Sequence, residues 1–330
     1  MLDIIRSLPE QLMGASRLEI PDITRAGYRR VLVGGMGGSA IGGDVARDVF
    51  RDVEFSIETI RDYHLPPYAL PGETLFIAVS YSGNTEETLS LFEQALERGV
   101  DTVAITSGGR LAEISRQKGI PLITIPGGYP PRGALGWIFG ALSMVMDGAG
   151  LLEGVEELLN ETGRFLTDIA EEIEGEESLS MDFASKFYRR LPILYAPSDM
   201  LSVALRWQAQ INENAKQMAH VNVLPEMNHN EINGIKHPPE VMRRSWVVFF
   251  RDMDTHPRIL KRMEITRSLI EEDVLGIDEV ESRGGSRMER IFYLIWLGDF
   301  VSYYLAVYNR EDPLAIPRIS HLKEALGREG

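Results

Sequence analysis

Ser80–Thr88 is the segment whose residue types and spacing most clearly suggest chemistry. It reads Ser-Tyr-Ser-Gly-Asn-Thr-Glu-Glu-Thr, with four serine or threonine side chains in nine residues. It follows an apolar stretch typical of a buried strand and opens a helix. Hydroxyl groups, a flexible glycine and the N–H groups of a helix N-terminus can together cradle a phosphate without a lysine. A single such loop could also be a polar turn with a helix cap.

Two further loops of small residues favour the phosphate-binding interpretation. Gly34–Asp44 is rich in glycine and follows another apolar strand, and Ser107–Gly109 follows a third. The first loop contains Gly-x-Gly-x-x-Ala at positions 35–40, which is also typical of dinucleotide sites. Such sites need an acidic residue about 20 positions further on, and Glu54 and Glu58 are near enough to leave this alternative open.

The elements that position these loops alternate between strand and helix. Alternation of this kind predicts an α/β fold with parallel sheets, in which ligands bind at the carboxyl ends of the strands. The second half of the chain repeats the plan more loosely. The predicted strands are Arg30–Gly35, Val53–Ile60, Glu73–Ser80, Asp101–Ser107, Pro121–Ile125, Leu191–Pro197, Ser245–Arg251 and Val274–Val280. The predicted helices include Ser39–Phe50, Gly133–Asp147, Leu201–Met218, Pro257–Glu272, Gly285–Tyr308 and Pro317–Gly327.

Length and composition limit the possible functions. A chain of 330 residues predicts two domains. The net charge of −15, with no basic cluster, argues against a nucleic-acid partner. The absence of cysteine favours a reducing cytoplasm, and the N-terminus does not resemble a signal peptide. Ile291–Tyr308 is apolar, but Asp299 at its middle favours a buried core helix over a membrane span.

The motifs together resemble those of a known family. The loops Gly37–Ser39 and Ser80–Glu87 resemble the sugar isomerase (SIS) domain. Pro131–Gly136, Asn212–Lys216 and Pro225–Glu231 extend the resemblance to the bifunctional phosphoglucose/phosphomannose isomerases, over essentially the whole chain. The resemblance implies two SIS-type αβα sandwiches, which we expect at residues 1–152 and 181–330, joined by an acidic helical linker at 153–180.

The resemblance also implies an activity and a set of site residues. It implies that glucose 6-phosphate and fructose 6-phosphate are interconverted by proton transfer through a cis-enediol. Glu213 would move the proton, Arg132 would stabilise the enediolate and His229 would open the sugar ring. Lys323 would assist ring opening. The phosphate would be bound by Gly38, Ser39, Ser80, Ser82 and Thr85. These roles suit the side chains, because a carboxylate, a fixed cation and an imidazole are the groups that such steps need.

Other residues could take these roles. Glu226 and Glu231 are rival carboxylates, and His220 is a rival imidazole. Taken alone, Glu213 and Lys323 also fit the solvated faces of helices, His229 could cap a turn, and Arg132 could begin a helix.

The resemblance further implies a homodimer whose site includes His229 of the neighbouring chain. It implies no cofactor, and the six histidines are too scattered for a metal site. Residues 312–320 lack the threonine that bifunctional members often carry before the C-terminal lysine, so mannose 6-phosphate is a less secure substrate than glucose 6-phosphate. A non-catalytic sugar-phosphate sensor and an NAD-linked dehydrogenase are the alternatives.

Overall fold

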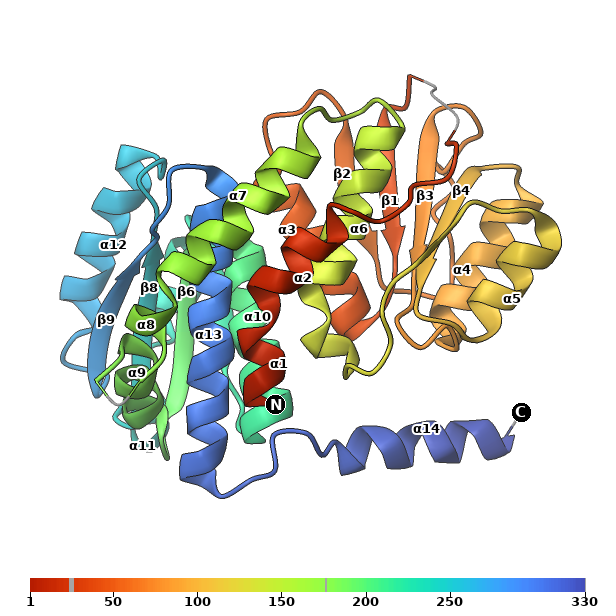
Figure 1. Cartoon of the computed structure of the whole chain (residues 1–330). Helices are drawn as coiled ribbons and strands as arrows, with labels where there is room; N and C mark the ends of the chain where they lie inside the picture. The colour runs from red at the N-terminus through yellow and green to blue at the C-terminus, as the bar shows by residue number, and fades with distance from the viewer. Residues whose placement is uncertain (24–26, 176, 330) are drawn as a thin grey trace.

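The computed structural model describes residues 1–23, 27–175 and 177–329. Within these residues, two sheets, each made of parallel strands, lie side by side (Figure 1). The first sheet has five strands in the order β2-β1-β3-β4-β5. The order reverses between β1 and β3, so the loops after these two strands flank the point where parallel sheets bind ligands. The strands are β1 (Arg30–Gly34), β2 (Ser56–Ile60), β3 (Thr74–Val79), β4 (Asp101–Thr106) and β5 (Leu122–Thr124).

Helices cover both faces of the first sheet, because its central strands are apolar throughout and successive side chains point to opposite faces. Val31 and Val33 of β1 face one core with α3 (Gly37–Val49) and α6 (Leu135–Gly148). Leu32 faces the other core, with α4 (Glu86–Glu97) and α5 (Gly109–Lys118). The N-terminal helices α1 (Leu2–Arg6) and α2 (Leu8–Ala15) lie outside the αβα plan, and α2 packs against α6.

The second sheet has four strands in the order β7-β6-β8-β9, again with a reversal between its first and third strands along the chain. One face packs on α9 (Leu179–Phe187), α10 (Leu201–Ala215) and α13 (Arg287–Asn309), and the other on α12 (Pro257–Ile270). The strands are β6 (Leu191–Pro197), β7 (His220–Leu224), β8 (Ser245–Arg251) and β9 (Gly276–Glu281). The remaining short elements are η1 (Pro131–Gly133), α8 (Ala170–Ile173), η2 (Ser198–Met200), η3 (Glu226–His229), η4 (Glu231–Asn233) and α11 (Pro239–Met242).

A single hydrophobic core runs between the two sheets. It joins residues of β1, α3 and α6 to residues of β6, β8, α10 and α13, and Phe139 and Phe292 meet edge to face at its centre with ring centroids 4.8 Å apart. Helix α13 is long and apolar enough to cross a membrane, but 78% of its apolar window is buried among the other helices. This burial confirms the prediction of a core helix.

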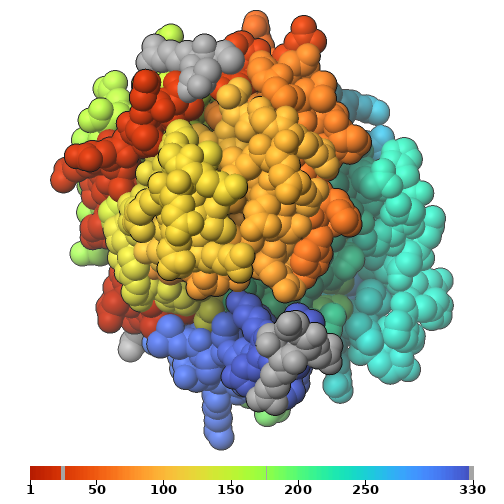
Figure 2. Space-filling model, turned by 90° about the vertical axis from the view of Figure 1, so that its right-hand side faces the viewer, coloured from red at the N-terminus to blue at the C-terminus, as the bar shows by residue number. Residues whose placement is uncertain are grey.

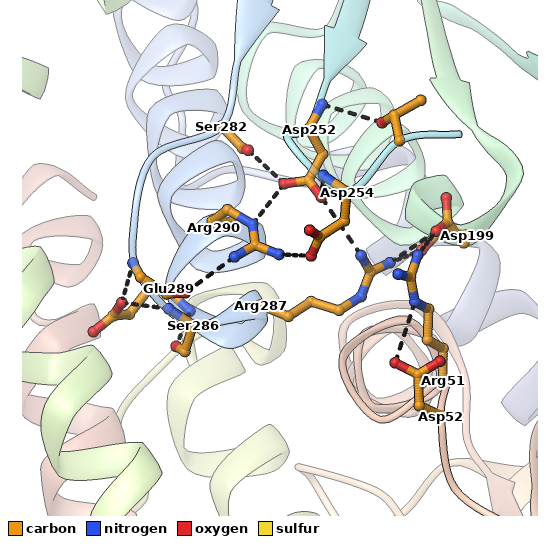
Figure 3. Close-up of polar contacts among 12 residues, drawn as sticks. Arg51, Asp52, Asp199, Asp252, Asp254, Ser282, Ser286, Arg287, Glu289 and Arg290 are labelled. Carbon is orange, nitrogen blue, oxygen red and sulfur yellow. Dashed lines mark hydrogen bonds and ion pairs between the residues drawn. The ribbon is translucent and has the colours of Figure 1, made fainter. Parts of the chain in front are cut away.

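Charged side chains join the sheets at the carboxyl edge of the second sheet (Figure 3). Arg290 Nε donates to Asp252 Oδ1 at 2.7 Å, and Ser282 Oγ donates to the same oxygen at 2.5 Å. Burial would raise the pKa of Asp252, but these hydrogen bonds together lower it below its usual value. Arg287 bonds Asp199 at 3.3 Å and the carbonyl of Asp48 in α3 at 2.7 Å, which ties the second sheet to the first.

Most predicted elements match the structure, with differences around α10. The helix ends at Ala215 rather than Met218, because Lys216 adopts a left-handed conformation with φ of 53°. The strand β7 follows where no strand was predicted. Helix α7 (Val155–Asp168) occupies the predicted acidic linker and packs on α2, and the domain boundaries themselves stay a prediction.

Helix α14 (Pro317–Glu329) lies apart from the two sandwiches. It follows the end of α13 and runs below the first sheet and its helices (Figure 1). From the side, its blue surface lies beneath the orange and yellow surface of the first sandwich (Figure 2). Several of its apolar side chains are exposed, namely Ile319, Leu322 and Leu326.

Candidate functional site

The loops after β1 and β3 meet at the carboxyl edge of the first sheet, as the sequence predicts. Ser39 in the first turn of α3 accepts a hydrogen bond from the backbone N–H of Tyr81 at 3.1 Å. The tyrosine side chain in turn holds a third loop: its hydroxyl donates to the carbonyl of Pro126 at 2.9 Å and accepts from the N–H of Tyr129 at 2.9 Å. The three loops therefore form one connected polar surface.

The start of α4 is free to bind an anion. Thr85 is its N-cap, and the Thr85 side chain makes no capping hydrogen bond to the first N–H groups of this helix. Uncapped N–H groups and the helix dipole favour a phosphate at this end. Ser82 is exposed and Thr85 is half-buried, whereas Ser80 is fully buried and donates to Thr85 Oγ1 at 3.0 Å. The geometry thus favours Ser80 as the residue that orients the Thr85 hydroxyl.

Two glycines allow these loops to approach closely. Gly83 has φ of 70°, and a Cβ there would lie 1.8 Å from the carbonyl oxygen of Gly108. A Cβ on Gly38 would lie 2.7 Å from the backbone nitrogen of Arg132. The loop after β1 therefore touches the turn that carries Arg132, which brings the phosphate loops next to the predicted catalytic arginine.

Arg132 and Glu213 lie together, although 81 positions separate them in the chain. Arg132 Nη1 is 3.4 Å from Glu213 Oε2. The arginine is 3% exposed, and Glu213 lies near the C-terminal end of α10 with a quarter of its side chain exposed. Burial lowers the pKa of Arg132, and the Glu213 carboxylate partly offsets this effect. A fixed guanidinium beside a partly solvated carboxylate is suited to proton transfer next to a developing negative charge.

Buried polar side chains hold Arg132 in place, and the sequence analysis did not identify them as site residues. Asn214 Oδ1 accepts from Arg132 Nε at 2.8 Å. Arg206 Nη2 donates to the backbone carbonyl of Arg132 at 2.8 Å, and Arg206 forms a two-bond pair with Asp299 at 2.7 and 2.9 Å. Ser302 accepts from Asn214 Nδ2 at 2.9 Å. Asp299 in the apolar stretch of α13 was the available signal in the sequence, since a buried acid of this kind needs a buried partner such as Arg206.

A segment after α13 covers the Arg132–Glu213 pair. Arg132 Nη2 donates to the carbonyls of Pro313 and Leu314 at 2.6 and 3.2 Å, and Lys216 donates to the carbonyl of Asp312. Burial and the nearby Arg132 lower the pKa of Lys216. A pocket of about 500 Å³ adjoins Glu213 between the end of α10 and residues 311–319. This pocket has room for a small ligand.

The other two predicted catalytic residues make no bond to the Arg132–Glu213 pair in the described part of the chain. His229 is exposed at the end of η3, and Lys323 is exposed on α14. Within the residues that the structure describes, neither side chain makes a hydrogen bond or ion pair. The rival residues Glu231 and His220 bond each other at 2.8 Å rather than either residue of the Arg132–Glu213 pair.

Comparisons with known proteins show the family to which the chain belongs. Residues 176–326 match the family model of the bacterial phospho-glucose isomerase C-terminal SIS domain. The bifunctional phosphoglucose/phosphomannose isomerase of Caldicellulosiruptor bescii is 40% identical, over 99% of this chain and 98% of that protein. The chain belongs to the bifunctional phosphoglucose/phosphomannose isomerase family. A second member of this family, from Thermoplasma acidophilum, is 36% identical over 91% of this chain and 90% of its own length.

The fold extends to more distant SIS proteins. The C-terminal domain of glucosamine-fructose-6-phosphate aminotransferase from Francisella tularensis superposes with a TM-score of 0.70. It is 13% identical and covers 95% of this chain and 97% of that one. This similarity supports two SIS-type αβα sandwiches. Family membership does not favour the dehydrogenase or sensor alternatives. Glu58, one of the acids considered for a dinucleotide site, accepts hydrogen bonds from Ser56 and Tyr68.

In the described residues, no group of three histidine, aspartate or glutamate side chains is arranged to hold a metal ion.

Proposed function

We propose that the protein interconverts glucose 6-phosphate and fructose 6-phosphate, and mannose 6-phosphate and the same ketose, by moving a proton between C1 and C2. Family membership supports the reaction, and the Arg132–Glu213 pair is the observation that carries the mechanism. A carboxylate that shuttles one proton between adjacent carbons, beside a fixed cation, is what an enediolate intermediate requires.

Glu213 acts as the base and Arg132 stabilises the enediolate. Asn214 bonds Arg132 Nε and so fixes the plane of the guanidinium, and Nη1 is directed toward the carboxylate. A cation that needs no reorganisation during the reaction typically contributes about 3–4 kcal/mol to the stability of the transition state.

The phosphate binds at the start of α4. Ser82 and Thr85 supply hydroxyl groups, the uncapped N–H groups of the helix supply further donors, and Ser80 orients Thr85. Gly38 and Ser39 complete the cradle from the loop after β1. The phosphate then anchors the far end of the sugar while C1 and C2 reach Glu213.

His229 opens the sugar ring and comes from the neighbouring subunit of a homodimer, and Lys323 assists it. His229 lies on a polar loop, and within the described chain it makes no bond to Glu213. A polar loop of this kind can reach across a subunit interface, so we propose that the neighbouring subunit supplies the histidine. A mixture of Glu213→Ala and His229→Ala dimers, unfolded and refolded together, should regain about a quarter of wild-type activity. A mixture that stays inactive despite demonstrated heterodimers would contradict a shared site.

The test of the function is a coupled assay with fructose 6-phosphate that scores both aldose products without added cofactor. Glu213→Gln should lower kcat by at least ~10³ with little change in KM, because the base acts in the transition state. Residues 312–320 contain no threonine before Lys323, so glucose 6-phosphate should be the faster product. Wild-type protein that yields neither aldose would refute the proposal. We place the enzyme in the cytoplasm.

A further inference from the structure

Glu231 joins the loop that carries His229 to the second sheet. Its carboxylate accepts hydrogen bonds from three side chains on two adjacent strands. Tyr195 donates to Oε1 at 2.5 Å, His220 Nε2 lies 2.8 Å from the same oxygen, and Asn222 donates to Oε2. Tyr195 of β6 and Asn222 of β7 are partners in the parallel ladder, so the strands themselves fix the spacing of two of the three donors.

The other polar side chains of this loop are also bound within the chain. Asn228 Nδ2 donates to Thr266 Oγ1 of α12 at 2.7 Å. Asn230 Nδ2 donates to Glu226 Oε1 at 2.9 Å. His229 lies between these two asparagines and is exposed, and no hydrogen bond or ion pair in the described part of the chain engages it. The loop is therefore fixed on both sides of a single unbound imidazole.

The apolar part of the loop is anchored as well. Met227, two residues before His229, is fully buried in the core between the second sheet and α12. Buried apolar anchors and satisfied polar groups restrict the backbone that carries the free imidazole.

We propose that Glu231, held by Tyr195, His220 and Asn222, is a positioning residue that fixes the direction in which His229 projects toward the substrate. The inference rests on the proposed function, because it assigns a role in ring opening to His229. It holds whichever subunit's site the imidazole enters. Proton transfer to a ring oxygen needs the imidazole within hydrogen-bond reach, and a displacement of about 1 Å can lower the rate about 10²-fold.

The surroundings of Glu231 argue against a direct role as the base. Both carboxylate oxygens are occupied by donors. Burial would raise the pKa of Glu231, but hydrogen bonds from His220, Asn222 and Tyr195 together lower it below its usual value. A carboxylate stabilised in this way is a weaker base. Glu231 lies two residues after His229, so it is placed to support that side chain.

The test is a double-mutant cycle with fructose 6-phosphate as substrate. Glu231→Gln replaces an acceptor with an amide, which keeps the shape of the side chain but loses at least one of the three bonds. We expect kcat to fall about 10-fold or more while KM changes less than about twofold. In a His229→Ala background, where spontaneous ring opening sustains a residual rate, Glu231→Gln should cause no further loss.

Matched variants separate positioning from folding. Glu58→Gln is the control. Like Glu231, Glu58 accepts hydrogen bonds from two or more side chains, here Ser56 and Tyr68, but it lies on β2. This substitution should leave kcat unchanged. Tyr195→Phe removes one bond to Glu231, and we expect a loss of about threefold in kcat with an unchanged circular dichroism spectrum.

Two outcomes would overturn the inference. One is wild-type kcat in Glu231→Gln together with wild-type kcat in Tyr195→Phe. The other is a full additional loss when Glu231→Gln is combined with His229→Ala, since this would show that Glu231 acts independently. Wild-type protein without isomerase activity would instead count against the proposed function.

Discussion

Replacing Asp299 by asparagine tests how the core holds Arg132, for which we propose a catalytic role. Asp299 is 4% exposed and bonds Arg206 through both oxygens, at 2.9 and 2.7 Å. Asp299→Asn leaves the Arg206 guanidinium buried without a counter-ion. Breaking a buried pair in this way costs about 3–5 kcal/mol. For 330 residues the entropy of unfolding is about 0.7 kcal/mol/K, so Tm should fall by about 4–7 °C.

Activity should fall together with stability, because Arg206 also bonds the backbone carbonyl of Arg132. We expect kcat to fall about 10-fold or more in Asp299→Asn as Arg132 loses this support. The assays are thermal unfolding followed by tryptophan fluorescence, and steady-state kinetics with fructose 6-phosphate well below Tm. Glu279→Gln is the control. It breaks the more exposed Arg251–Glu279 pair and should lower Tm by less than about 2 °C.

A double substitution separates the two effects. Arg206→Met with Asp299→Leu replaces the pair with apolar side chains, which is often neutral or stabilising. Tm should recover most of its loss, but kcat should stay low because the bond to the Arg132 carbonyl is still missing. Wild-type Tm and kcat in Asp299→Asn would refute the reasoning. A double variant no more stable than the single one would show that the unpaired charge is not the cause.

Three further predictions concern the loops and the solution conditions. Gly83→Ala should raise KM at least ~10-fold, since its Cβ would collide with Gly108, whereas Gly119→Ala, with φ of 66° but open space, should leave KM unchanged. Activity should survive exhaustive EDTA treatment, and loss restored by zinc or magnesium would contradict this. Glu231 raises the pKa of His220, so the pair stabilises the fold at pH values where His220 is protonated and Glu231 is still ionised. In urea unfolding at pH 6, the free energy of unfolding of the wild type should exceed that of His220→Gln by at most about 1 kcal/mol. This difference should disappear by about pH 9. A difference that stays constant with pH would count against the pair.

The sequence by itself determined the order of the strands and helices and the loops that precede each helix. Apolar strands ending in glycine, serine and threonine fix where the backbone turns, and these features are local. The loops at Ser39 and Ser80–Thr85, which we propose bind the phosphate, could be located in this way. The motif around Glu213 could be recognised too, although its partner could only be inferred from the resemblance.

The tertiary structure alone decided which distant side chains meet. Arg132 and Glu213 come together because α10 ends beside the turn before α6, and the core between the two sheets sets that approach. The left-handed conformation of Lys216 was not predicted. The edge strand β7 was missed because a five-residue strand at an edge carries little hydrophobic signal. The bonds that Asp299 and Glu231 make also depend on packing across the chain, so the sequence alone could not predict the partners of these carboxylates.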